Sequence, residues 1–181
     1  MLIAAMPNKQ TSDMLRSWFT REGIASERLT FYGYTNTRDY LALHHQVDIC
    51  LDTSPYTSGT TGFHALWMGV PTLTLVGTTL PSRASASILL PAGLPEFVTY
   101  SEEEFLERGH CLANDINHLA KLRAIMRKRM TDSAIGQPAI ISHGLEMAMR
   151  SIWRRWCARL PAVSFDAIDH TASGLAGKPQ E

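Results

Sequence analysis

The chain has 181 residues, of which 45% are hydrophobic and 19% charged, values that are typical of a globular protein and exclude global disorder. Its 17 basic residues balance its 17 acidic ones, so net charge gives no basis for binding nucleic acid or an anionic membrane. No apolar run reaches the roughly 18 residues of a membrane span. Cys50, Cys111 and Cys157 are too far apart for a disulfide framework or a zinc site, so a reducing, cytoplasmic location is expected.

Short apolar runs alternate with helical patterns from residue 2 to about residue 98. Strands are predicted at residues 2–5, 29–32, 49–51, 70–76 and 97–98. Helices are predicted at residues 14–22, 37–46, 60–67, 82–89, 101–111, 119–130 and 143–160. A strand that begins at the first residues is typical of a piece of a longer protein.

This alternation predicts βαβ units. The expected fold is therefore α/β, a Rossmann-like parallel sheet with helices on both faces. The domain is expected to span residues 1–160, including the C-terminal helices. Residues 161–181 are small and polar, and we expect them to form a disordered tail.

The stretch from Asp48 to Pro71 predicts a phosphate site. A short apolar strand is followed by a loop of Thr, Ser, Pro and Gly, and a helix then begins at Thr60 and Thr61. The first N–H groups of a helix lack intrahelical partners and lie at the positive end of its dipole, so they attract anions. Gly59 and Gly62 are expected to let a ligand approach the backbone closely. The site is neither a P-loop nor a GxGxxG dinucleotide site, because neither motif occurs.

The loops that follow the strands at 29–32 and 70–76 are expected at the same edge of the sheet, because ligands bind at the carboxyl ends of parallel strands. His64 lies one turn into the helix that Thr60 begins, on the face of the Thr hydroxyls. Arg83 could steady an anion, Ser82 is interpreted as a helix N-cap, and Trp67 is expected in the core. No nucleophile–base pair, paired carboxylates or metal-ligand motif is found in the sequence, so no metal or cofactor is predicted.

Several linked blocks resemble the O-GlcNAc transferases, including their bacterial relatives of the SPINDLY type. The blocks are Val47-Asp48-Ile49-Cys50-Leu51-Asp52, Gly59-Thr60-Thr61-Gly62, Ala65-Leu66-Trp67-Met68-Gly69-Val70-Pro71, Gly77-Thr78-Thr79-Leu80-Pro81-Ser82-Arg83-Ala84-Ser85-Ala86-Ser87 and Gly93-Leu94-Pro95-Glu96. The resemblance implies the C-terminal Rossmann-like domain of a GT-B glycosyltransferase, which binds the nucleotide-sugar donor, usually UDP-GlcNAc, without a metal. It also implies that a protein acceptor binds through an N-terminal half and tetratricopeptide repeats that this chain lacks.

The resemblance also assigns roles to residues. It implies that Thr60 and Thr61 contact the donor diphosphate, together with Gly59 and Gly62. The nucleoside would contact Thr35, Thr37, Tyr40 and His64, and the accessory candidates are Tyr34, Ser58, Ser82 and Arg83. The sequence departs from the animal members of the family at four of these positions. Thr37 replaces a lysine, Tyr40 a histidine, His64 an aspartate and Gly59 a histidine.

Three functions remain open from the sequence. The first is the donor-binding half of an inverting glycosyltransferase that moves GlcNAc to Ser or Thr of a protein. The second is a catalytically inactive nucleotide-binding or protein-interaction fragment. The third is a GT-B enzyme that uses a different nucleotide sugar, an alternative that the histidine at position 64 keeps open.

Overall fold

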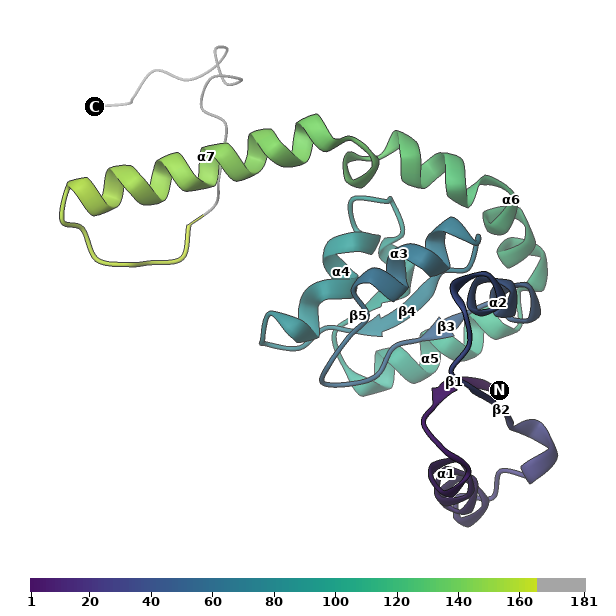
Figure 1. Cartoon of the computed structure of the whole chain (residues 1–181). Coiled ribbons are helices and arrows are strands. Elements are labelled where there is room, and N and C mark those ends of the chain that lie inside the picture. The colour runs from purple at the N-terminus through teal and green to yellow at the C-terminus, as the bar shows by residue number, and fades with distance from the viewer. Residues whose placement is uncertain (166–181) are drawn as a thin grey trace.

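The computed structural model describes residues 1–165 (Figure 1). Its strands are β1 (Leu2–Met6), β2 (Thr30–Gly33), β3 (Cys50–Leu51), β4 (Thr72–Leu75) and β5 (Val98–Thr99). Its α-helices are α1 (Lys9–Arg21), α2 (Thr37–Leu43), α3 (Thr60–Trp67), α4 (Ala84–Leu89), α5 (Glu102–Ala113), α6 (Ile116–Asp132) and α7 (Pro138–Cys157). Residues 166–181 of the predicted tail lie outside the described residues.

The strands all pair in parallel, but they form two sheets. β1 pairs with β2, and β4 lies between β3 and β5. In Figure 1, α3 and α4 lie on one face of the three-stranded sheet and α5 on the other. The predicted α/β fold with parallel strands and helices on both faces is therefore confirmed.

The hydrophobic core surrounds β4. Leu66 of α3, Leu73 of β4, Leu89 of α4, Phe97 and Met126 of α6 are each at most 1% exposed. These apolar positions come from five separate segments, and burying them removes a large apolar surface from water. This core fixes α3, and with it the helix start that the sequence singles out.

A tight turn joins α3 to β4 and presses against α6. Gly69 has φ +81°, and a Cβ there would lie 2.9 Å from Cγ and 3.0 Å from the carbonyl oxygen of Arg123. The Arg123 guanidinium in turn donates hydrogen bonds to the carbonyls of His44 and Val47 and lies 3.7 Å from a carboxylate oxygen of Asp48. One arginine of α6 thus holds the segment between α2 and β3 in place.

Helices α1 and α7 are packed far more loosely. No residue of α1 or α7 is buried. Helix α1 begins at Lys9, earlier than predicted, because the Asn8 side chain caps it by accepting a 2.8 Å hydrogen bond from the N–H of Thr11. Helix α7 extends away from the sheets in Figure 1. None of the helices among residues 1–165 is both long and apolar enough to cross a membrane.

Candidate functional site

The loop between β3 and α3 is anchored by polar side chains. Asp52 accepts a 2.8 Å hydrogen bond from the N–H of Ser58. The Thr57 hydroxyl donates to the carbonyl of Pro81 at 2.7 Å, and the hydroxyls of Ser58 and Ser85 lie 2.8 Å apart. These contacts tie the loop after β3 to the segment after β4, so the structure brings these two loops to the same edge, as predicted.

Two threonines begin α3 with free donors. Thr60 and Thr61 are exposed, and within the described chain neither their backbone N–H groups nor their hydroxyls have a hydrogen-bond partner. Gly59 precedes them as an N-cap with no side chain to occupy those N–H groups, while its carbonyl accepts the N–H of Gly62 at 2.9 Å and that of Phe63 at 3.3 Å. This helix end therefore offers four unpartnered donors to an anion.

The two glycines of this site have different surroundings. A Cβ at Gly59 would meet nothing within 4 Å, so the backbone there is open to a ligand. Gly62 is buried, and a Cβ there would lie 3.0 Å from the Ser58 hydroxyl oxygen and 3.6 Å from Ile88. Gly62 thus lets α3 pack against the anchored loop. Ser58 also stabilises the loop, because its N–H donates to Asp52 and its hydroxyl hydrogen-bonds with that of Ser85.

An aromatic cluster joins α2 to α3. The Tyr40 ring lies edge-on to the rings of His64 and His44, at centroid distances of 5.7 Å and 5.2 Å. Nδ1 of His64 is buried without a hydrogen-bond partner. Burial raises the pKa of Tyr40 and lowers that of His44. The structure thus places Tyr40 beside His64, two residues that the resemblance assigns to the nucleoside, and leaves one ring nitrogen unsatisfied there.

The remaining nucleoside candidates, Thr35 and Thr37, and the accessory candidate Tyr34 lie between β2 and the first turn of α2. Tyr34, Thr35 and Thr37 are exposed, and Tyr34 is 78% exposed. None of their side chains hydrogen-bonds to another of the residues that the structure describes. Their assignment to a ligand stays a prediction.

Two expectations from the sequence are wrong. Ser82 does not cap a helix: it is 3% exposed, and its hydroxyl donates to the carbonyl of Thr79 at 2.8 Å and accepts the N–H of Thr79 at 3.0 Å. The hydroxyl closes the turn after β4 and leaves no room for a Cβ at Gly77, which would lie 2.5 Å from it.

Trp67 is 43% exposed instead of buried, because it ends α3 at the surface under the Arg127 guanidinium, 4.7 Å from the ring centroid. Arg83 is exposed, as a surface arginine would be.

Sequence reasoning missed the residues that hold the loop. Asp52, Thr57 and Ser85 build the anchor, and Oδ2 of Asp52 is buried without a partner. An acidic residue directly after a strand and the small polar run at 82–87 were the available signals. Their partners lie 6 to 28 residues away, which no local pattern reveals.

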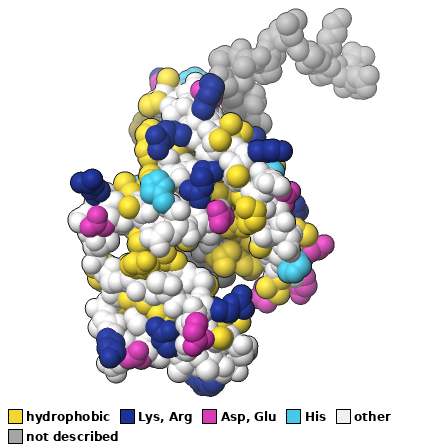
Figure 2. All heavy atoms as spheres, turned by 90° about the vertical axis from the view of Figure 1, so that its right-hand side faces the viewer, with side chains coloured by type: hydrophobic (Ala, Val, Ile, Leu, Met, Phe, Trp, Pro, Cys, Tyr) yellow, Lys and Arg dark blue, Asp and Glu magenta, His cyan; other side chains and the backbone are white. Residues whose placement is uncertain are grey.

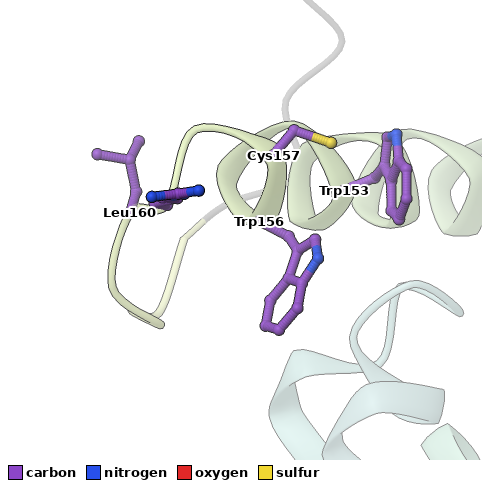
Figure 3. Close-up of a pocket in the computed structure, with 5 residues that line it drawn as sticks. Trp153, Trp156, Cys157 and Leu160 are labelled. Atoms are coloured by element: carbon purple, nitrogen blue, oxygen red, sulfur yellow. The ribbon is translucent and has the colours of Figure 1, made fainter.

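Other chemistry is not indicated among the described residues. They contain no group of three or more His, Cys, Asp or Glu side chains that could hold a metal. Burial and the nearby Asp52 carboxylate raise the pKa of Cys50 to about 11, so its thiol is protonated and a poor nucleophile. A shallow space of about 480 Å³ lies at the end of α7, lined by Trp153, Trp156, Cys157, Arg159 and Leu160 (Figure 3). It is formed by exposed side chains of one helix and its following turn, away from the predicted site.

Comparisons with known proteins show which family this chain resembles. The family model for glycosyl transferase family 41 matches residues 3–143. A probable UDP-N-acetylglucosamine–peptide N-acetylglucosaminyltransferase SPINDLY of Petunia hybrida is 36% identical over 119 residues, 66% of this chain and 13% of that protein. A UDP-N-acetylglucosamine–peptide N-acetylglucosaminyltransferase of Caenorhabditis elegans is 28% identical over 166 residues, 92% of this chain and 14% of that protein.

A solved structure is also similar. An O-GlcNAc transferase variant of Thermobaculum terrenum superposes with a TM-score of 0.74 at 36% identity, covering 84% of this chain and 29% of the other. The chain therefore corresponds to less than a third of that structure and to about a seventh of the two curated relatives.

Proposed function

The chain belongs to glycosyl transferase family 41, and on that premise we propose that it is the donor-binding part of an enzyme that transfers N-acetylglucosamine from UDP-GlcNAc to Ser or Thr of a protein. The relatives' names supply the donor and the peptide acceptor. The observation that carries the proposal is the helix start at Thr60 and Thr61, where two N–H groups and two hydroxyls are exposed and unpartnered.

The chemistry of the transfer requires these donors. In an inverting transfer, the acceptor hydroxyl attacks the anomeric carbon from the face opposite the diphosphate. The bond between that carbon and the diphosphate oxygen breaks, and its electron pair leaves with UDP. Negative charge therefore grows on the diphosphate, where the helix amides and both hydroxyls stabilise it without requiring a metal. The hydroxyl proton leaves to a base outside this chain.

The nucleoside has a matching position. Tyr40 and His64 lie together on α2 and α3, and the unsatisfied Nδ1 of His64 can hydrogen-bond with a ribose hydroxyl. We assign Tyr34, Thr35 and Thr37 to the same end of the donor, because they occupy the segment that leads into the helix of Tyr40. Acceptor binding and the base belong to polypeptide that this chain does not contain, so the isolated chain binds nucleotide weakly and turns over nothing.

A thermal-shift panel tests the proposal. UDP should raise the melting temperature of the chain, whereas ADP and GDP at the same concentration should not, because only a bound ligand stabilises the folded state. A shift with another nucleotide alone would contradict the UDP assignment and favour a GT-B enzyme with a different donor. No shift with any nucleotide would contradict donor binding by this chain and favour a protein-interaction fragment.

A further inference from the structure

Arg123 of α6 is bound to the segment that follows α2. Figure 2 faces the side on which α6 lies in Figure 1, and Lys and Arg side chains lie there among hydrophobic ones. The Arg123 guanidinium donates hydrogen bonds to the carbonyls of His44, at 3.2 Å, and of Val47, and the side chain is only 30% exposed. A guanidinium is a planar fork of five donors, so one side chain can hold two carbonyls in a fixed relative position. These bonds tie the end of α2 to α6.

The same arginine contacts the turn that ends α3. Gly69 packs so closely on Arg123 that an added Cβ would lie 2.9 Å from its Cγ and 3.0 Å from its carbonyl oxygen. The N–H of Met68, the residue before Gly69, donates to the carbonyl of His64 at 3.0 Å. His64 is therefore one helical turn away from the contact with Arg123.

The two residues assigned to the nucleoside are linked to Arg123 from both sides. The Tyr40 ring lies edge-on to the His44 ring at 5.2 Å and to the His64 ring at 5.7 Å. Contacts from Arg123 thus reach Tyr40 through His44 and reach His64 through the end of α3. We infer that Arg123 is a positioning residue, which sets the spacing of Tyr40 and His64 and thereby the affinity for the nucleoside of the donor. The inference rests on the proposed function, which assigns the nucleoside to these two rings.

The diphosphate end of the site is held by other contacts. The loop before α3 is anchored by the bond from Thr57 to Pro81 and by that between Ser58 and Ser85. None of these four residues bonds to Arg123 in the described chain. Loss of the guanidinium should therefore disturb the nucleoside end and leave the start of α3 in place. A general loss of folded structure would instead weaken both ends of the site equally.

Titration with two ligands, followed by NMR of the whole chain, tests the inference. The ligands are UDP and inorganic pyrophosphate, which has the diphosphate but no nucleoside. Arg123→Met keeps an unbranched stem without the guanidinium. It should bind UDP at least about tenfold more weakly, because a small displacement of positioned groups is costly, but pyrophosphate within about threefold of the natural chain.

Arg129→Met is the matched control. Arg129 also lies on α6 and donates to a loop carbonyl, but that carbonyl belongs to Gly93 after α4, at 3.3 Å. This variant should bind both ligands within about threefold of the natural chain. Equal UDP affinity of the two variants would overturn the inference, as would equal losses of UDP and pyrophosphate binding in Arg123→Met. A natural chain that binds no UDP would instead contradict the proposed function.

A measurement without ligand keeps the test independent of nucleotide binding. The Tyr40 ring shifts the NMR signals of the His64 ring protons, and Tyr40→Leu removes that shift. Arg123→Met should move these signals toward those of Tyr40→Leu, whereas Arg129→Met should leave them in place.

Arg123→Lys checks the role of the guanidinium and carries the test if the methionine variant does not fold. It keeps the charge and can still donate to one carbonyl, so its UDP affinity and its His64 signals should lie between those of the natural chain and of Arg123→Met. Unmoved His64 signals in both Arg123 variants would overturn the inference.

Discussion

Residues 50–132 bury many of their large apolar side chains, whereas helix α7 exposes them. From β3 to α6, large side chains such as Leu73, Phe97 and Met126 are fully buried around β4. On α7, Ile152, Trp153 and Trp156 are 51–75% exposed, and no residue is buried. The first part is stabilised by its own core, whereas α7 presents an apolar surface to its surroundings. The helix start at Thr60 and Thr61 lies on the first part, away from α7.

The largest effect should come from the core. Phe97→Ala should lower the free energy of unfolding by about 3–5 kcal/mol, because it opens a cavity among side chains that cannot all collapse into it. Trp153→Ala removes a larger ring from α7, yet it should change stability by only about 0.5 kcal/mol or less, because that ring is 65% exposed. Urea unfolding of both variants checks this. Equal losses of unfolding free energy in the two variants would show that Trp153 of α7 is packed against other protein atoms in solution.

A glycine pair separates crowding from backbone strain. Gly69→Ala should cost about 2–4 kcal/mol, since Ala must adopt a left-handed conformation and also push against Arg123. Gly93→Ala has the same left-handed backbone, φ +72°, but open space around its Cβ, so it should cost only about 1–2 kcal/mol. Thermal unfolding measures the difference. If Gly93→Ala cost as much as Gly69→Ala, the contact between Gly69 and α6 would contribute nothing.

A smaller effect depends on pH. Burial holds the pKa of His44 below its usual 6.5, and the nearby His64 and Arg123 lower this pKa further, while the Tyr40 ring packs edge-on against the His44 ring. The unfolded chain therefore binds a proton that the folded chain does not. Stability from neutral His44 is complete above pH 6.5 and falls as the pH drops from there toward the folded pKa. His44→Gln should flatten this slope in urea titrations, whereas His45→Gln, at an exposed neighbour, should leave it intact.

The sequence predicted the fold class because the alternation of apolar runs and helical patterns is a local signal. It also predicted the helix start at Thr60. The signal there is again local: a loop of small residues is followed directly by apolar residues at helical spacing. It could not predict the division of the sheet, because strand pairing depends on which edges meet in space. For the same reason it missed Asp52, Thr57 and Ser85, whose partners are distant in sequence, and misplaced Trp67, whose exposure depends on where α3 ends against α6.

We propose that the start of α3 binds the donor diphosphate. Calorimetry of UDP binding to three forms of the chain tests it most directly: the natural sequence, Thr60→Val with Thr61→Val, and Thr60→Ser with Thr61→Ser. Valine keeps the shape of threonine without its hydroxyl, so the valine pair should bind UDP at least about tenfold more weakly, the loss expected when hydrogen bonds to a charged group are removed. The serine pair keeps both hydroxyls and should bind within about threefold of the natural chain. Equal affinity of all three forms for UDP would contradict diphosphate binding by the hydroxyls of Thr60 and Thr61.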